Sequence, residues 1–278
     1  MTTVSILIPS RLQKFSDGAR EEYFFRRAVL SILRQSLIVS GRLRPQILIG
    51  IDAGVEAPED VARELGVEFV NSGGTSHAVA LNAAAEHIAG DYVAILEDDD
   101  QWEPQFFEIA LEASQEKAFV SSSQIEVDSA GRVRRIIDYP TPSSWFMPRS
   151  VWDAVGHFDE SYRWHIDTEW LGRLNERAFE RVHLVEAAAP SLDSLRRITV
   201  LDTLLGRRKA KQARQGLLRI ETANPNARIF RHSSNRPLVV REFHEASLHT
   251  VIEQNAGSRS QSDGEKVRLQ KRFGVIPW

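Results

Sequence analysis

One short stretch constrains the fold more than any other part of the chain: an apolar run that stops abruptly at four consecutive acids. From Gly90 the sequence reads GDYVAILEDDDQWEP, so that Tyr92–Leu96 is followed directly by Glu97–Asp100. An apolar run of this length between polar residues predicts a buried strand. In open α/β sheets, ligands bind in the crevice beyond the carboxyl ends of the strands, so the four acids stand where a site is expected.

The charge of this stretch favours a cation. Carboxylates about 5 Å apart repel by roughly 3 kcal/mol per pair at an effective dielectric near 20. Either some of the acids stay protonated or a cation neutralises them. Carboxylate oxygens suit Mg²⁺ or Mn²⁺, and Mg²⁺ takes substrate phosphates as further ligands. The stretch therefore predicts a metal site for a phosphorylated substrate, and the alternative is a solvated acidic turn before a helix that begins near Pro104.

Length and composition predict a soluble globular protein. The chain has 278 residues, 42% of them hydrophobic, which is enough for one large domain or a domain with an appendage. No apolar run approaches the roughly 20 residues of a membrane span, and the N-terminus turns polar too early for a signal peptide, so a cytoplasmic location is the default expectation. The chain has no cysteine, which leaves oxygen or imidazole ligands for a metal, and its net charge of −3 gives no overall attraction to nucleic acid.

Strands and helices are predicted to alternate through the first half of the chain. The expected strands are Val4–Ile8, Gln46–Ile51, Val67–Val70 and Tyr92–Leu96, and the expected helices are Glu21–Leu37, Pro58–Leu65 and Ser76–Ala89, the last ended by Gly90. Such alternation indicates a parallel sheet covered by helices on both faces.

The second half predicts a mixed topology. Phe119–Val127 and Arg132–Ile137 flank the turn sequence DSAG, which indicates an antiparallel hairpin. The other expected elements are a helix from Pro104, an extended segment Trp145–Pro148, helices at Ser150–Val155 and Asp167–Phe179, and a strand at Val182–Val185. Beyond Pro190 a basic segment with spaced leucines predicts amphipathic helices, and the polar segment Asn255–Glu265 predicts a mobile loop. We therefore expect a core domain over 1–190 and a mainly helical, basic extension over 191–278.

Four sequence blocks together resemble the family 2 glycosyltransferases of the GT-A fold. They are VSILIPSR with the following SILRQ, ILIGIDAG, ALNAAAEHIAGDYVAILEDDDQWEP and MPRSVWDAVGHFDESYRWHIDTEWLGRL, spanning about Val4 to Leu174. The resemblance implies a Rossmann-like, mainly parallel mixed sheet, with nucleotide-sugar binding in about 1–104 and acceptor binding in about 105–190. It also implies inverting transfer of a hexose-type sugar from a nucleoside-diphosphate donor, such as a UDP-sugar, to a hydroxyl acceptor with Mn²⁺ or Mg²⁺, as in polysaccharide biosynthesis.

The resemblance implies metal-binding roles within the acidic stretch, which is similar to the family's Asp-x-Asp motif. The family pattern is Asp-x-Asp-Asp before x-Trp-x-Pro, and alignment on Trp102 and Pro104 places Glu97, Asp98 and Asp99 on the first three motif positions. The first Asp is Glu in this chain. The alignment implies that Asp99 is the main metal ligand and that Asp98 lies beside the ribose or the metal.

Other positions resemble the nucleotide site of the family. Pro9, Ser10 and Arg11 fall in the first loop, which wraps the nucleotide, and Asn82 falls at a recurrent family position. Asp52 matches the acid that accepts hydrogen bonds from the base. A carboxylate that accepts from a ring N–H distinguishes uracil from cytosine, and the same acid also serves guanine or thymine. An Asx turn before Gly54 is the structural alternative for Asp52.

The block FDESYRWHIDTEWLGRL resembles the family region that carries the catalytic base. Asp167 matches the base, Arg173 follows it by six residues, and Ile166 stands where the family usually has Glu. An inverting transferase needs a base within hydrogen-bond reach of the acceptor hydroxyl, and a carboxylate at a helix start can supply it. The alternatives are a helix N-cap role for Asp167 and a structural ion pair for Arg173.

Two further sets of residues are candidates for ligand contacts. Trp145, Trp164 and His165 are predicted walls of the sugar or acceptor site, since aromatic faces pack on the C–H faces of pyranose rings; the alternative is a place in the core. His232 is a candidate to supply an imidazole to the metal or a contact to the diphosphate.

The sequence leaves partners and rival functions open. The basic segment is either a solvated helix face or a peripheral contact with an anionic membrane surface or a lipid-linked acceptor. The sequence is compatible with a monomer and with a homo-oligomer. One rival function is a sugar-phosphate nucleotidyltransferase, although Pro9-Ser10-Arg11 lacks the glycines expected after the first strand; the other is a non-catalytic nucleotide-sugar-binding protein.

Overall fold

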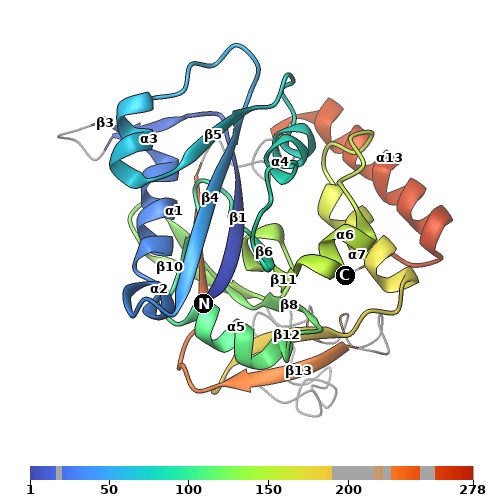
Figure 1. Cartoon of the computed structure of the whole chain (residues 1–278). Coiled ribbons are helices and arrows are strands. Elements are labelled where there is room, and N and C mark those ends of the chain that lie inside the picture. Colours follow the sequence, from blue (N-terminus) through green and yellow to red (C-terminus); the bar gives the residue numbers. More distant parts are fainter. Residues whose placement is uncertain (17–20, 190–216, 218–219, 221–226, 245–253, 278) are drawn as a thin grey trace.

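The fold is built around an eight-stranded sheet in the order β13-β12-β8-β11-β6-β1-β4-β5 (Figure 1). The computed structural model describes residues 1–16, 21–189, 217, 220, 227–244 and 254–277. Its strands are β1 (Thr2–Ser10), β4 (Leu43–Ile51), β5 (Glu68–Asn71), β6 (Tyr92–Ile95), β8 (Phe119–Ser122), β11 (Phe146–Pro148), β12 (Arg181–Glu186) and β13 (Ala227–His232). All neighbouring pairs are parallel except those of β11 with β6 and β8. The predicted mixed, mainly parallel sheet is confirmed.

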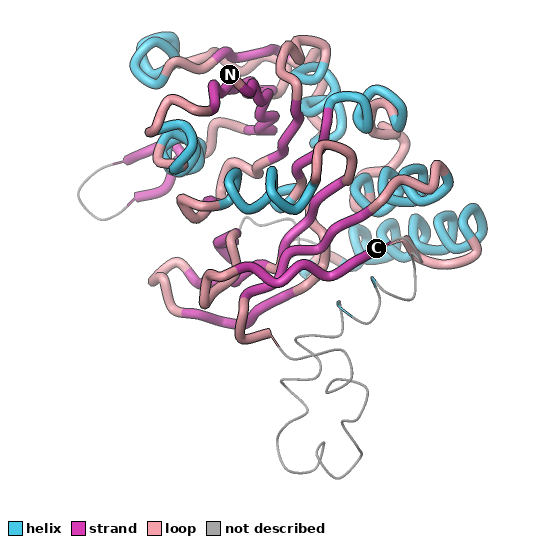
Figure 2. Tube along the Cα trace, turned by 60° about the horizontal axis from the view of Figure 1, so that its bottom comes forward, coloured by secondary structure: helices cyan, strands magenta, loops and turns pink. Residues whose placement is uncertain are grey.

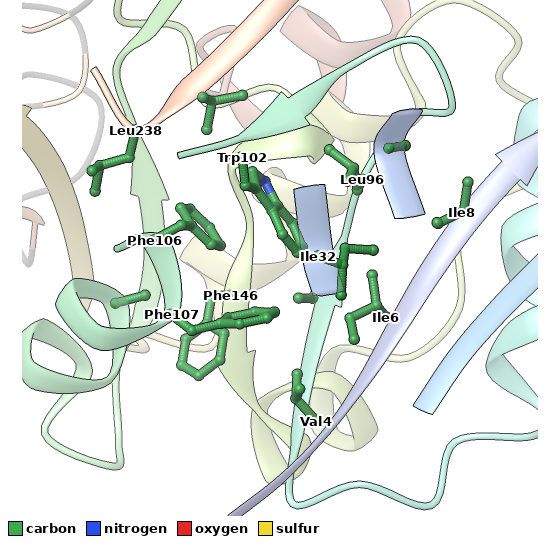
Figure 3. Close-up of a cluster of buried hydrophobic side chains, with 14 of the residues drawn as sticks. Val4, Ile6, Ile8, Ile32, Leu96, Trp102, Phe106, Phe107, Phe146 and Leu238 are labelled. Carbon is green, nitrogen blue, oxygen red and sulfur yellow. The ribbon is translucent and has the colours of Figure 1, made fainter. Parts of the chain in front are cut away.

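Helices cover both faces of the sheet, because successive side chains of a strand point to opposite sides. In β1, Ile6 and Ile8 face one core and Leu7 faces the other. The first core includes residues of α1 (Phe24–Leu33), α2 (Ser36–Val39), α3 (Glu59–Leu65) and α5 (Phe106–Ser114). The second includes residues of α4 (His77–Ala85), α6 (Arg149–Val155), α7 (Ile166–Glu176) and α13 (Ala256–Phe273). Figure 2 shows helices on both sides of the strands, and Figure 3 shows part of the first core.

A second, four-stranded sheet has the order β10-β9-β14-β7. It contains the predicted hairpin, formed by β9 (Gln124–Asp128) and β10 (Val133–Ile137), together with β7 (Gln101–Trp102) and β14 (Val239–Phe243). A short hairpin of β2 (Lys14–Ser16) and β3 (Glu21–Tyr23) precedes α1, and the 3₁₀ turn Pro142–Ser144 precedes β11. Because β7 begins one residue after Asp100, the second sheet lies directly beside the acidic stretch.

Close packing of α4 on β4 depends on Gly50. A Cβ built on Gly50 would lie 2.1 Å from the carbonyl oxygen of Ala80. A glycine opposite an alanine-rich helix lets the two backbones approach, which a larger side chain would prevent. This contact brings the start of α4, with His77, over the carboxyl ends of the central strands.

Several predicted boundaries are wrong. The helix expected over Glu21–Leu37 divides into β3, α1 and α2, and the strand expected over Phe119–Val127 divides into β8 and β9. Helix α4 ends at Ala85, so Gly90 does not terminate it. Gly90 instead packs against β1, where a Cβ would lie 2.6 Å from the backbone nitrogen of Ser5. Tertiary contacts rather than helix termination therefore require this glycine.

The extension beyond residue 190 differs most from the prediction. The mobile loop expected over Asn255–Glu265 is wrong, because this segment begins α13, with the Asn255 side chain accepting from Ser258 N at 3.1 Å. Strands β13 and β14 were not predicted, and they complete the two sheets. The basic segment and its amphipathic helices lie outside the described residues, apart from positions 217 and 220, and the domain boundary at 190 stays a prediction. No helix in the described part of the chain is both long and apolar enough to span a membrane.

Candidate active site

The carboxyl ends of three adjacent strands bring predicted nucleotide-site residues together. Strands β6, β1 and β4 are neighbours in the sheet. Ser10 ends β1, and its Oγ donates to Asp98 Oδ2 at 2.6 Å. Asp52 follows β4, and its Oδ2 lies 3.9 Å from Nε of Arg11, whose side chain is half exposed. Pro9 lies within β1, beside Gly50 of β4. These residues therefore lie at the carboxyl-end edge of the sheet, where the sequence predicts a ligand-binding crevice.

Three carboxylates of the acidic stretch form a cluster suited to a cation. Glu97, Asp99 and Asp100 each offer an oxygen, and these oxygens all lie within 4.8 Å of one another. Asp100 is almost fully buried, and its Oδ2 has no hydrogen-bond partner among the described residues. Hard oxygen donors at this spacing fit Mg²⁺ or Mn²⁺. The cluster contains the predicted ligand Asp99, but Asp98 turns toward Ser10, and Asp100 was not predicted.

Basic side chains from β14 and its C-terminal end, and from α4, lie beside this cluster. Nε2 of His244, the residue after β14, is 2.9 Å from Asp99 Oδ2. An Nη of Arg241 lies 3.7 Å from Glu97 Oε2, and Nδ1 of His77 lies 3.9 Å from Glu97 Oε1. Strand β14 reaches the site because it pairs with β7 and β9. The extension beyond residue 190 thus supplies the charges that compensate the acids.

Burial and mutual repulsion change the protonation of the acidic stretch. Burial raises the pKa of Asp98 to about 7; the charge of Asp99 adds to this effect, and the hydrogen bond from Ser10 opposes it. Burial and the charges of Asp99 and Glu97 also raise the pKa of Asp100 well above its usual value. The hydrogen bond to Asp99 raises the pKa of His244. The pKa of Arg241 is also raised, because the neighbouring acids raise it by more than burial lowers it.

We expect the metal-free protein to lose stability as the pH rises between about 4 and about 7. A carboxyl whose pKa is raised on folding binds its proton more tightly in the folded state. The free-energy cost of ionising it in the folded protein is absent below the unfolded-state pKa and complete above the folded-state pKa. The folded-state pKa is about 7 for Asp98. One such group contributes a slope of at most about 1.4 kcal/mol per pH unit. Asp98→Asn should therefore flatten the profile of unfolding free energy against pH.

This prediction is measured by urea unfolding in EDTA from pH 5 to pH 8. The control is Asp263→Asn, which changes an exposed carboxylate on α13. If the slope of Asp98→Asn equals that of the wild type, the raised pKa of Asp98 does not influence stability.

Asp167 lies in the first turn of α7. It is not the N-cap, because that position belongs to His165. Asp167 Oδ1 accepts from the backbone nitrogen of Thr168 at 2.7 Å and from Thr168 Oγ1 at 3.3 Å. In the same helix, Arg173 donates to the buried Glu169 at 2.9 Å and to the carbonyl oxygens of residues 155 and 157. Arg173 therefore forms a structural ion pair with Glu169, which is the alternative given for it above.

Asn82 uses its whole amide to hold the loop before α7. Its Nδ2 donates to the carbonyl oxygen of Phe158 at 3.0 Å and to Glu160 Oε1 at 2.9 Å, while its Oδ1 accepts from Phe158 N at 2.9 Å. The structure thus places this predicted nucleotide-site residue in a structural contact between α4 and the segment that leads to Asp167.

The predicted acceptor-site aromatics separate into two groups. Trp145 is fully buried in the core, where its Nε1 donates to the carbonyl oxygen of Pro140 at 2.7 Å, so it does not form a wall of an open site. Trp164 and His165 are partly buried and contact α13, through Gln261 Oε1 at 3.2 Å and Ser262 Oγ at 2.9 Å respectively. Only these two remain available to face an acceptor.

The structure does not bring His232 to the acidic cluster. It ends the edge strand β13, beside Glu186 of β12, and three strands separate β13 from β6. Strands in a sheet are about 4.8 Å apart, which places β13 about 19 Å from β6. The imidazoles at the cluster are those of His244, beside Asp99, and His77, beside Glu97. The apolar run Leu238–Val240 just before Arg241 favours a strand, but it does not identify the strand's partners.

Comparison with known proteins identifies the class. The family model described as glycosyl transferase family 2 matches residues 19–168. This chain belongs to glycosyl transferase family 2.

Part of this chain is similar to solved structures of S. aureus TarS. The chain is similar to a crystal structure of S. aureus TarS, with 14% sequence identity and a TM-score of 0.45 over 62% of this chain and 33% of that chain. It is also similar to S. aureus TarS 1-349 in complex with UDP-GlcNAc, with 12% identity and a TM-score of 0.42 over 62% of this chain and 54% of that chain. The chain thus spans between a third and about half of the length of these proteins. No curated protein sequence matches it.

Proposed function

We propose that this protein is an inverting, metal-dependent glycosyltransferase that moves a hexose-type sugar from a nucleoside-diphosphate-sugar to a hydroxyl acceptor. The observation that carries the proposal is the cluster of Glu97, Asp99 and Asp100, whose oxygens lie within 4.8 Å of one another beyond the end of β6. A buried carboxylate oxygen without a partner among the described residues, Asp100 Oδ2, is costly unless a cation or a proton satisfies it.

The metal ligands of this proposal come from the acidic cluster. Glu97, Asp99 and Asp100 would hold Mn²⁺ or Mg²⁺, while His244 would stay hydrogen-bonded to Asp99 beside the ion. When bound, the ion would neutralise the charge that develops on the departing nucleoside diphosphate. Asp98 has a different task in this proposal: its hydrogen bond to Ser10 ties the acidic loop to the end of β1, next to the ribose.

The nucleotide would lie across the ends of β1 and β4. Asp52 would accept a hydrogen bond from the base, and Arg11, half exposed and 3.9 Å from Asp52, would reach the diphosphate. Pro9 and Ser10, the last two residues of β1, would line the site beside them. The opposite charges of Arg11 and Asp52 keep both side chains at this edge before a donor binds.

Asp167 would act as the catalytic base. Thr168 holds Oδ1 of its carboxylate, and Oδ2 would take the proton of the acceptor hydroxyl. The acceptor oxygen forms its bond to the anomeric carbon while the bond from that carbon to the diphosphate oxygen breaks, and the nucleoside diphosphate leaves with the electron pair. Attack from the face opposite the leaving group inverts the anomeric centre.

We expect Asp167→Asn to lower transfer by about 10²- to 10⁴-fold, the range for loss of a positioned general base. Transfer is measured as nucleoside diphosphate released from UDP-, GDP- or dTDP-sugars with Mn²⁺ and an acceptor extract. Donor binding, followed by thermal shift, should not change, because Asp52, Ser10 and Asp98 lie at the strand ends. The control is Glu176→Gln, a half-exposed change at the other end of α7.

Three outcomes would contradict the proposal. Sugar transfer at the wild-type rate by Asp167→Asn would show that Asp167 is not the catalytic base. Pyrophosphate formed from a nucleoside triphosphate and a sugar 1-phosphate would favour a nucleotidyltransferase. Donor binding without turnover of any acceptor would favour a non-catalytic protein.

A further inference from the structure

One buried carboxylate of α13 accepts three consecutive backbone N–H groups from the loop before α7. Glu265 is 3% exposed. Its Oε1 accepts from Arg163 N at 2.9 Å, and its Oε2 accepts from Trp164 N at 2.9 Å and from His165 N at 3.1 Å. About one hundred residues separate the carboxylate from the loop, so no local turn explains the arrangement.

The carboxylate lies where a negative charge is favourable. Helix α7 begins at Ile166, directly after the three N–H groups. Backbone N–H groups that converge near a helix start attract anions, and the positive end of the helix dipole adds to the attraction. Hydrogen bonds to an ionised acceptor are shorter and stronger than those to a neutral one. Glu265 therefore fixes the backbone of 163–165 more firmly than a neutral side chain would.

Other contacts keep α13 in one register along α7 (Figure 1). An Nη of Arg272 lies 2.7 Å from Oε1 of the fully buried Glu169. The Phe273 ring covers Gly172 so closely that a Cβ there would lie 2.4 Å from the ring. Because these contacts lie further along both helices, Glu265 cannot slide relative to the start of α7.

We propose that Glu265 is a positioning residue for sugar transfer, holding the entry of α7 so that Asp167 points at the acceptor. The inference rests on the proposed function, in which Asp167 is the base. Asp167 follows His165 by two residues, and Thr168 already holds its Oδ1, so the backbone of the first turn sets the direction of the carboxylate. The backbone of that turn is what Glu265 holds.

Glu265→Gln should lower kcat by about 10- to 100-fold, since a displacement of about 1 Å at a reacting group costs up to about 10² in rate. The amide keeps the size of the side chain but replaces one acceptor oxygen with a donor, which faces an N–H group. The KM for the donor and the donor-induced thermal shift should stay at the wild-type values, because the proposed donor site lies at the ends of β1, β4 and β6. Asp263→Asn, on the exposed side of α13, is the control.

A double-mutant cycle distinguishes positioning from general stabilisation. If Glu265 acts through Asp167, adding Glu265→Gln to Asp167→Asn should change the remaining rate by less than about 2-fold. If the helix only stabilises the fold, the two losses should multiply. Amide hydrogen exchange of residues 163–168 gives a readout independent of activity, and we expect faster exchange in Glu265→Gln.

Two results would overturn this proposal. One is an unchanged kcat together with unchanged exchange at 163–168 in an active enzyme, which would leave the proposed function intact. The other is multiplicative loss in the cycle. A wild-type protein that transfers no sugar would instead refute the proposed function, and the role of Glu265 with it.

Discussion

Asp99→Asn should lower sugar transfer by about 10²- to 10³-fold, the cost of removing one preorganised group that stabilises developing charge. Asp99 belongs to the oxygen cluster with Glu97 and Asp100, and it also holds His244 at 2.9 Å. The substitution keeps the shape of the side chain but removes its charge. The cation then loses a charged ligand, and the His244 imidazole loses its charged hydrogen-bond partner. The Asp99 side chain is 21% exposed, and we expect the fold to be retained.

Two measurements check this expectation: nucleoside diphosphate release at saturating Mn²⁺, and the thermal shift that Mn²⁺ produces without donor. Both should fall in Asp99→Asn. The control Asp153→Asn changes an exposed carboxylate on α6 and should alter neither. Transfer at the wild-type rate in Asp99→Asn would eliminate the metal role assigned to the cluster.

Arg241→Met should lower the unfolding free energy of the metal-free protein by about 3 kcal/mol, the lower end of the range for removing one partner of a buried ion pair. The lower end applies because the Arg241 side chain is 25% exposed. Its guanidinium interacts with the charges of Glu97, Asp100 and Asp99, and these acids lose that compensation in the variant. Methionine replaces the apolar stem, so the loss reports the charge rather than packing.

Mn²⁺ should stabilise Arg241→Met more than it stabilises the wild type, because a bound cation supplies the missing positive charge. Urea unfolding with EDTA and with Mn²⁺ measures the difference. Arg236→Met is the matched control, since Arg236 pairs with Glu103 at a 62% exposed position on the surface and should cost at most about 1 kcal/mol. An equal effect of Mn²⁺ on Arg241→Met and the wild type would show that Arg241 and the cation do not compensate the same acids.

The edge of the sheet at which the candidate site lies could be predicted because it depends on local pattern. A strand in a parallel sheet ends at the same edge as its neighbours, so Ser10, Asp52 and Asp98 were expected together once three strands had been recognised. Contacts of Ser10 with Asp98 and of Arg11 with Asp52 occur at that edge.

The members of the acidic cluster could not be predicted in the same way. Residues 97–100 form a tight turn, in which Asp100 N donates to the carbonyl oxygen of Glu97 at 3.1 Å. Side-chain directions in such a turn do not follow the alternation of a strand, so the sequence did not show that Asp100 joins the cluster while Asp98 turns to Ser10. Trp145 shows a related limit, because a tryptophan in a core and one in a sugar site have the same local pattern.

By itself the sequence determined the alternation of main-sheet strands with helices in the first half of the chain, the mainly parallel sheet and the edge at which the acids lie. Periodicity and strand ends are local properties, and they carry this information. Only the tertiary structure decided that His244 and Arg241 compensate the acids and that Glu265 holds the start of α7. These contacts join residues that are more than 100 positions apart. They depend on how β14 and α13 dock, which follows from the packing of the whole chain and not from any short segment.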